Sequence, residues 1–345
     1  MTATTTRRLS FMVGVLALGL MSAAPWTGAG VRAQAQTQGQ TQGRGGAQGR
    51  GAAATAAAPA PVQTPAGPPE YGPPKGTLVI VGGGSTDGTT IMEKFIELGG
   101  GAENGNFVVV PTNGGNRNAD GSLKPYVEAT VIASWQRRGV KNVHMLHTAD
   151  PKVADTAEFA AVLKDATAVW FDGGRQWNCV DSYAGTLTER EFHKVLERGG
   201  VIGGSSAGAT IQGDYLVRGD TKGPDIMMTE EPNHQKGFEF LRHSAIDQHI
   251  NTRLRWDDLD AVIKRYPTLL GIGLSEGTAI VVTGDRFEVM GKWKVAIHDN
   301  TQMYQPWEKP YYVLGAGDVY NMKTRKVEKY FNGATPAPGR GRGGH

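Results

Sequence analysis

The sequence has little cysteine and little net charge. Cys179 is the only cysteine among 345 residues, which excludes an intramolecular disulfide framework and any metal site built from several cysteines. The formal net charge is +3, and residues 1–35 account for it, because Arg7, Arg8 and Arg32 have no acidic counterpart there. In the rest of the chain, basic and acidic residues are equal in number. A protein that binds nucleic acid would keep a basic excess, so the composition argues against a nucleic-acid partner.

Residues 1–35 have the pattern of a secretory signal peptide. Arg7 and Arg8 precede a short apolar run, Phe11–Ala24, which is below the roughly 20 residues that a spanning helix needs. Small-residue cleavage sites follow at 31–35. We therefore expect export to the periplasm or beyond, by the Sec or the twin-arginine route, without stable membrane insertion. An uncleaved membrane anchor is the alternative.

Two segments have compositions that cannot support a packed core. Residues 36–74 are rich in Gln, Gly, Ala and Pro, and residues 333–345 are rich in Gly and Arg. Such segments bury too little apolar surface to offset the entropy of ordering. The sequence therefore predicts a disordered linker, a folded domain over 75–332 and a disordered tail.

The folded part alternates between strand-like and helix-like runs. Strands are expected at Thr77–Val81, Phe107–Val110, Asn142–Leu146, Ala166–Phe171 and Gly200–Gly203, and helices at Thr90–Leu98, 123–138, Ala154–Lys164 and Glu189–Arg198. This alternation predicts an α/β fold with a mostly parallel, doubly wound sheet. Short β-like runs over 279–316 predict a small antiparallel appendage, and the sequence leaves open whether it forms a homodimer contact.

Glycine clusters follow two of these strands, at Gly82–Gly84 and Gly173–Gly174. Binding sites of such sheets lie at the carboxyl ends of the strands. The first cluster lacks the spacing of a dinucleotide-binding loop, because Asp87 stands where the third glycine would be. A tight turn with close backbone approach is the simpler interpretation, and no cofactor is implied.

The strongest chemical signal is Gly204-Ser205-Ser206-Ala207-Gly208. It matches Gly-x-Ser-x-Gly and lies between an apolar strand and a stretch that can form a helix, which is the context of a nucleophile elbow. Small neighbours suit the sharp turn, and the following helix start points backbone N–H groups toward the serine. An ordinary glycine turn is the alternative.

A nucleophilic serine needs a base and an acid that orients the base. His249 follows a short apolar run, and Glu276 ends another, so Ser206, His249 and Glu276 are one candidate triad. Asp260 and His298 are another, in the chain order of α/β-hydrolase esterases. A binding module that kept the fold and lost its activity is the third interpretation.

Several ordered motifs between about Gly76 and Val282 resemble cyanophycinase and its relatives, a serine peptidase family that includes the α-aspartyl dipeptidases. The motifs are Ile-Val-Gly-Gly-Gly at 80–84, Gly-Gly-Arg-Gln at 173–176, Gly-Gly-Ser-Ser-Ala-Gly-Ala at 203–209, Asp-Gln-His at 247–249 and Gly-Ile-Gly-Leu-Ser-Glu at 271–276. The resemblance implies a flavodoxin-like fold related to class I glutamine amidotransferases, whose elbow carries cysteine. It also implies a peptide or cyanophycin-like polymer as substrate.

The resemblance also implies roles for particular residues. Ser206 would be the nucleophile, His249 the general base and then acid, and Glu276 the group that orients His249. The backbone N–H groups of Gly174 and Ala207 would form the oxyanion hole. The residues implied to line the substrate pocket are Gln176, Asp247, Gln248 and Arg255.

Two residues depart from the family pattern. Asp258 stands about where a further arginine is expected, and Arg175 replaces an acidic residue that is frequent between Gly-Gly and Gln. Arginine recognises carboxylates through paired hydrogen bonds, so these changes bear on the substrate. The expectation is an exported serine peptidase that cleaves peptide or isopeptide bonds near aspartyl residues through an acyl-enzyme.

Other reactive side chains receive structural interpretations. His144, His147 and Asp150 are spaced three apart, but the two histidines fall on a strand and in the loop after it, so no metal site is expected. Cys179 has no elbow and is expected to pack in the interior.

Overall fold

Short runs rich in β-branched residues form five parallel strands in the first half of the chain. They are β1 (Thr77–Val81), β2 (Asn106–Val110), β3 (Asn142–Met145), β4 (Ala168–Phe171) and β5 (Val201–Ser205). The structure is a computed structural model that describes residues 67–118 and 120–331. The predicted signal peptide, nearly all of the predicted linker and the Gly/Arg tail lie outside these described residues.

The order of the parallel strands is β3-β2-β4-β5-β1. Its first four members reproduce the flavodoxin-like order 2-1-3-4, and β1 takes the place of the fifth strand. The order reverses between β2 and β4, where ligands bind in open α/β sheets. The α/β fold and its parallel part are therefore confirmed.

The predicted antiparallel appendage is confirmed, and its strands are divided between two sheets. β8 (Thr278–Thr283) pairs with β1 and continues the main sheet through β9 (Arg286–Gly291), β12 (Val319–Asn321) and β13 (Lys326–Lys329) to nine strands. A second sheet has the order β11-β10-β7-β6. Its strands are β6 (Ser244–Gln248), β7 (Leu270–Leu274), β10 (Val295–His298) and β11 (Tyr312–Leu314).

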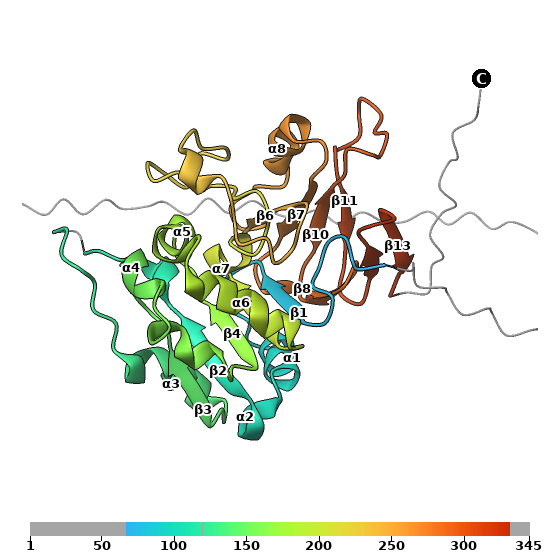
Figure 1. The fold of residues 1–345 in the computed structure, drawn as a ribbon. Coiled ribbons are helices and arrows are strands. Elements are labelled where there is room, and N and C mark those ends of the chain that lie inside the picture. Colours follow the sequence, from blue (N-terminus) through green and yellow to red (C-terminus); the bar gives the residue numbers. More distant parts are fainter. Residues whose placement is uncertain (1–66, 119, 332–345) are drawn as a thin grey trace, which may run out of the picture. The chain divides into compact units, whose positions relative to one another are not determined.

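Side chains alternate along the central strands, so each strand serves two cores. Val79 and Val81 pack with α1 (Ile91–Leu98) and α3 (Glu128–Arg137) on one face. Leu78 and Ile80 face the other side, where α5 (Trp177–Tyr183), α6 (Leu187–Glu197) and the second sheet pack (Figure 1). The remaining helical segments are α2 (Gly101–Asn104), η1 (Thr112–Gly114), α4 (Pro151–Ala154), η2 (Phe159–Leu163), α7 (Ala207–Thr210), η3 (Pro232–His234) and α8 (Leu259–Arg265).

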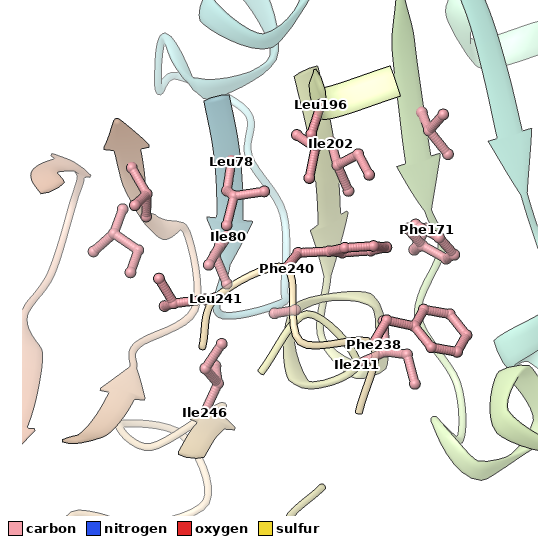
Figure 2. Close-up of a cluster of buried hydrophobic side chains, with 14 of the residues drawn as sticks. Leu78, Ile80, Phe171, Leu196, Ile202, Ile211, Phe238, Phe240, Leu241 and Ile246 are labelled. Atoms are coloured by element: carbon pink, nitrogen blue, oxygen red, sulfur yellow. The ribbon is translucent and has the colours of Figure 1, made fainter. Parts of the chain in front are cut away.

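A loop between α7 and β6 contributes to the apolar core that the two sheets share. Phe238, Phe240 and Leu241 are each at most 1% exposed and belong to the same core as Ile80 and Ile246. Figure 2 shows these side chains between the strands of the main sheet and the start of the second sheet. Fully burying one such side chain contributes about 1.5–3 kcal/mol, so this loop helps to stabilise the packing of the two sheets.

The predicted helix over 154–164 is wrong. The chain instead forms the short helix α4 and the 3₁₀ turn η2, with residues 155–158 between them. Asp150 is the N-cap residue of α4, where its side chain accepts a hydrogen bond from Lys152 N, and Pro151 suits the first turn. Thr156 Oγ1 then accepts from Phe159 N, which starts a new turn, because threonine side chains compete with helical hydrogen bonds.

The ordered fold starts earlier than the predicted boundary at residue 75. Tyr71 is 4% exposed, and its backbone N–H donates to Asp285 Oδ1 at 2.8 Å. The guanidinium of Arg242 donates to the carbonyl groups of Pro69 and Gly72. Residues 67–74 are therefore part of the packed structure, which corrects the linker prediction for this stretch. Over residues 67–118 and 120–331, no helix is long and apolar enough to cross a bilayer.

Candidate active site

Ser206 occupies a sharp turn between β5 and α7. Its backbone has φ 59° and ψ −116°, a conformation that costs a non-glycine residue of the order of 1–3 kcal/mol. The Ser206 N–H donates to Val81 O at 3.0 Å, which ties the turn to β1. A Cβ on Gly204 would lie 2.3 Å from Gly208 O, so the small flanking residues are needed. The turn has the geometry of a nucleophile elbow.

Two further polar side chains reach Ser206 from the second sheet. Ser206 Oγ lies 2.7 Å from His249 Nε2, and His249 Nδ1 lies 2.5 Å from Glu276 Oε1. His249 directly follows β6 and Glu276 comes just after β7, which are parallel neighbours. The structure thus brings the sequence-predicted triad together where the two sheets meet.

The surroundings set the charge of the two titratable groups. Burial lowers the pKa of His249, and the hydrogen bond to Glu276 opposes only part of this effect. Burial acts to raise the pKa of Glu276, but hydrogen bonds from His249 and Thr252 outweigh it, so the pKa is lowered overall. At pH 7 the carboxylate is ionised and the imidazole is neutral. An ionised Glu276 requires the proton on Nδ1, which leaves Nε2 as an acceptor toward Ser206.

The glycine turn after β1 supports this arrangement. A Cβ on Gly83 would lie 2.2 Å from His249 Cε1, and one on Gly84 would lie 2.6 Å from Glu276 Oε2. Backbone hydrogen bonds link the same turn to His249 N and to Gly277 N. The turn therefore gives close backbone approach, as the sequence predicts, and the approaching groups are His249 and Glu276.

Backbone donors lie on the other side of Ser206. A Cβ on Gly173 would be 3.4 Å from Ser206 Cβ, so the loop after β4 runs directly beside the serine. Gly174 has φ 140°, and a Cβ there would lie 1.9 Å from Asn113 O, which restricts the position to glycine. Within residues 67–118 and 120–331, the N–H groups of Gly174 and Ala207 donate no hydrogen bond. Both donors are available for a ligand oxygen.

The residues predicted to line the substrate pocket differ in their environments. Gln176 Nε2 donates to Val217 O at 2.6 Å, and Gln248 and Arg255 are 6% and 7% exposed. Gln248 Oε1 and Arg255 Nη1 have no hydrogen-bond partner among the described residues. They are buried polar groups next to the triad segment, and a bound molecule could satisfy them.

Asp247 corrects the prediction that it lines the pocket. Its side chain is 0% exposed, and both carboxylate oxygens accept from Arg218, at 2.8 and 2.9 Å. Arg218 Nη2 also lies 2.5 Å from Asp258 Oδ2, the residue that departs from the family pattern. Asp247 therefore holds a buried arginine instead of facing a substrate.

Sequence reasoning missed Arg218, Asn113, Asn251 and Thr252. Thr252 Oγ1 donates to Glu276 Oε1 at 2.9 Å, and Asn251 Oδ1 accepts from Glu276 N at 2.9 Å. Both follow His249 closely, so proximity to the predicted base was the available signal. Arg218 and Asn113 follow apolar runs without any motif, and no sequence signal marks them.

The rival candidates do not assemble around Ser206. His298 is 2% exposed and its ring packs at a tilt against Tyr311, and its burial lowers its pKa to about 4. Asp260 instead accepts from Lys264. The serine hydroxyl is bonded to His249, so the esterase arrangement is not the one observed.

The group of His144, His147 and Asp150 and the side chain of Cys179 are not part of this site. His144 lies 3.8 Å from Glu128, and His147 Nδ1 lies 2.9 Å from Thr112 Oγ1, so the two rings contact different groups. In the described part of the chain, no three His, Cys, Asp or Glu side chains are arranged to hold a metal ion. Cys179 is buried in the core, and burial raises the pKa of its thiol.

Known proteins resemble the chain in sequence and in fold. The sequence model of peptidase family S51 matches residues 78–290. The cyanophycinase of Geminocystis herdmanii is 27% identical over 272 residues, which is 72% of this chain and 94% of that protein. The cyanophycinase of Thermosynechococcus vestitus is 26% identical over 273 residues, 74% of this chain and 81% of that protein.

Among solved structures, a peptidase from an acI-B1 actinobacterium is similar in fold. Its TM-score is 0.52 at 23% identity, over 72% of this chain and 97% of that one. At this identity the likeness concerns the fold alone, and it agrees with the α/β architecture described above.

Proposed function

We propose a reaction for this chain from one premise: the chain belongs to peptidase family S51 and is a serine-type exopeptidase. The proposal is that Ser206, His249 and Glu276 hydrolyse peptide or isopeptide bonds near aspartyl residues through an acyl-enzyme. The continuous hydrogen-bonded line from Ser206 Oγ through His249 to Glu276 is the observation that carries it.

In the first half of the reaction, Ser206 Oγ attacks the carbonyl carbon of the scissile bond. His249 Nε2 accepts the hydroxyl proton, which the lowered pKa of the ring permits because the imidazole starts neutral. Glu276 stabilises the imidazolium that forms and keeps the ring in the required tautomer. His249 then passes the same proton to the leaving amine, and the C–N bond breaks.

The charge that develops on the carbonyl oxygen needs donors. The N–H groups of Gly174 and Ala207 flank Ser206 and are proposed to donate to that oxygen. Removing one such donor typically costs about 2.7–4 kcal/mol of transition-state stabilisation. In the second half, water attacks the acyl-enzyme, with His249 as base, and the acid product leaves.

The substrate class rests on the relatives and is part of the proposal. The relatives reported above are cyanophycinases, which supports a substrate containing aspartyl residues. Cyanophycin itself is the first candidate, and shorter α- and β-aspartyl peptides are the others.

A direct test combines a substrate panel with active-site variants. The purified chain is incubated with cyanophycin and with α- and β-aspartyl dipeptides, and products are read by mass spectrometry. Ser206→Ala should abolish turnover, and His298→Ala should leave it largely intact. Denaturing mass spectrometry of an early time point should find an acyl adduct on the peptide that contains Ser206. A fully active Ser206→Ala variant would overturn the proposal.

We also propose that the chain is exported, with residues 1–35 as a cleaved signal peptide. The support is the sequence pattern of Arg7, Arg8 and the apolar run after them. Cell fractionation with N-terminal sequencing tests it: the mature chain should begin close to residues 33–36 and leave the cytoplasmic fraction. An intact N-terminus in the cytoplasm would contradict it.

A further inference from the structure

A cavity of about 390 Å³ is lined by residues that directly follow two segments of the candidate site. Its walls include Asn116, Arg117, Arg175, Trp177, Asn178 and Asp181. Arg175 directly follows Gly174, and Asn116 and Arg117 follow the Asn113–Gly114 backbone against which Gly174 packs. The cavity is therefore one residue along the chain from the proposed donor at Gly174.

Two of the residues that line the cavity, Arg175 and Arg117, have guanidinium groups that form no ion pair with a described carboxylate. Arg175 Nη2 donates to the carbonyl oxygen of Asp220 at 2.5 Å, and Arg117 Nη1 donates to that of Gly121 at 2.8 Å. Among the described residues, no Asp or Glu oxygen lies within 4.0 Å of either group. Within the described part of the chain, both guanidinium groups are hydrogen-bonded only to backbone oxygens.

The acidic groups near the cavity already have other partners. Asp181 Oδ1 lies 2.7 Å from His234 Nε2. The Asp220 carboxylate accepts from Thr229 Oγ1 and from Lys222 N. Burial lowers the pKa of Arg175, and nearby Asp220 and Asp225 offset this only in part. Arg175 is half-buried, which makes an unpaired charge there costly unless a ligand supplies the counter-charge.

We propose that this cavity is a subsite for a carboxylate of the substrate, held by Arg175 and Arg117, and that it disfavours a substrate guanidinium. Arginine binds a carboxylate through paired charge-assisted hydrogen bonds, whereas it repels a second guanidinium. The inference rests on the proposed function, because it assigns the group next to the scissile bond. The enzyme would then prefer acidic aspartyl peptides, such as Asp-Asp, over arginine-bearing ones.

The carboxylate could belong to an acidic side chain or to the C-terminus of the peptide. Amidated forms of the same peptides separate these sources. Every peptide of the panel carries the terminal carboxylate, so amidation lowers kcat/KM of all of them equally if the subsite binds that group, and it leaves the preference for Asp unchanged if the subsite binds the side chain. Both outcomes keep the subsite.

The test compares kcat/KM for aspartyl dipeptides whose second residue is Asp, Gln or Arg, each in α- and β-linked form. The wild-type chain should favour Asp over Arg by about 10- to 100-fold, the range expected for a hydrogen bond between charged groups. Arg175→Asp should reverse the order, and Arg175→Lys should keep it with a higher KM. Arg137→Gln is the matched control, because Arg137 is exposed on α3, and it should leave the ratio unchanged.

Failure of this inference is distinguishable from failure of the reaction. If Ser206→Ala is inactive but the wild type prefers the Arg peptide, the subsite is refuted and the reaction stands. The same holds if Arg175→Asp lowers kcat/KM equally for all peptides. If wild type cleaves none of the peptides, calorimetry with Ser206→Ala measures their binding. The acidic peptide should bind at least 10-fold more tightly than the arginine peptide, and equal or reversed affinities would refute the subsite. Thermal unfolding of each variant checks the fold.

Discussion

Gly83 lies so close to His249 that a Cβ at this position would fall 2.2 Å from the ring carbon Cε1. The backbone of the turn after β1 is thus in contact with the imidazole. Real Cβ atoms do not approach another atom this closely, so any side chain at position 83 must move the ring or the turn.

Gly83→Ala should therefore lower kcat far more than it lowers stability. A displacement of about 1 Å between reacting groups can cost roughly 100-fold in rate. Part of any stability loss comes from the positive φ of 97°. Gly185→Ala is the matched control, since Gly185 has φ 75° and nothing within 4 Å of its Cβ position. Equal activity of the two variants in steady-state assays would show that the contact does not matter.

Glu276→Gln should reduce kcat by about 100- to 10,000-fold, because an amide can hold His249 in the wrong tautomer. The carboxylate also acts to raise the pKa of His249. Its loss should move the acidic limb of the kcat/KM profile to lower pH. A pH profile measured between pH 4 and 9 tests both effects. An acidic limb that moves to higher pH would contradict the assigned contact.

Thr252→Val should lower kcat less than Glu276→Gln does, and it should act through the same carboxylate. The threonine hydroxyl donates to Glu276 Oε1 and helps to lower the pKa of that carboxyl group. Without it, the pKa of Glu276 should rise toward its ordinary value, and kcat should fall by a few fold, with the loss concentrated at low pH. Thr252→Ser should restore the wild-type profile, since it keeps the hydroxyl.

Arg218→Met should destabilise the fold by about 3–5 kcal/mol, because it leaves Asp247 as an uncompensated buried charge. Adding Asp247→Leu should recover part of this loss. Arg190→Met serves as the control: its ion pair with Asp155 is exposed on both sides and should contribute at most about 1 kcal/mol. Denaturant unfolding measures all of these variants. Comparable losses from Arg218→Met and Arg190→Met would be incompatible with the buried pair.

His234 should stabilise the loop that it holds more at low pH than at high pH. Its ring nitrogens lie 2.7 Å from Asp181 and 2.7 Å from Glu231. Burial acts to lower the pKa of His234, but these carboxylates outweigh it and raise the pKa overall. The folded state then binds the proton more tightly, so the stabilisation is full below about pH 6.5 and falls as pH rises through the folded pKa. The Tm difference between wild type and His234→Ala should shrink from pH 5.5 to pH 9. A difference that grows with pH would contradict this.

Local sequence patterns were sufficient to predict the parallel strands and the turn at Ser206. β1, β2 and β4 are short apolar runs followed by Gly82, Pro111 and Asp172-Gly173, and Ser206 stands in a motif whose small neighbours have a steric reason. These signals are local, so they can be read without the fold. The extent of the antiparallel part could not be predicted in this way, because β8 and β10 look alike in sequence and pair in different sheets.

Asp247 and Arg218 mark the limit of sequence reasoning at the site. Asp247 stands next to His249 in a motif of polar residues, which suggests a shared role in substrate contact. Strand alternation alone would place residues 247 and 249 on one face. His249, however, lies beyond the end of β6 with φ 58°, and the Asp247 side chain lies in the interior, where a distant arginine balances it. Neither the buried partner 29 residues away nor its positive φ of 56° has a sequence signature.

Ser206 and its two partners are carried by different sheets, and a shared apolar core that includes Phe238, Phe240 and Leu241 packs those sheets together. The rate of turnover should therefore depend on the spacing between the sheets. On gentle warming, the layers can drift by a fraction of an ångström while every strand remains paired. Catalysis would then fade at temperatures where circular dichroism still reports a native protein.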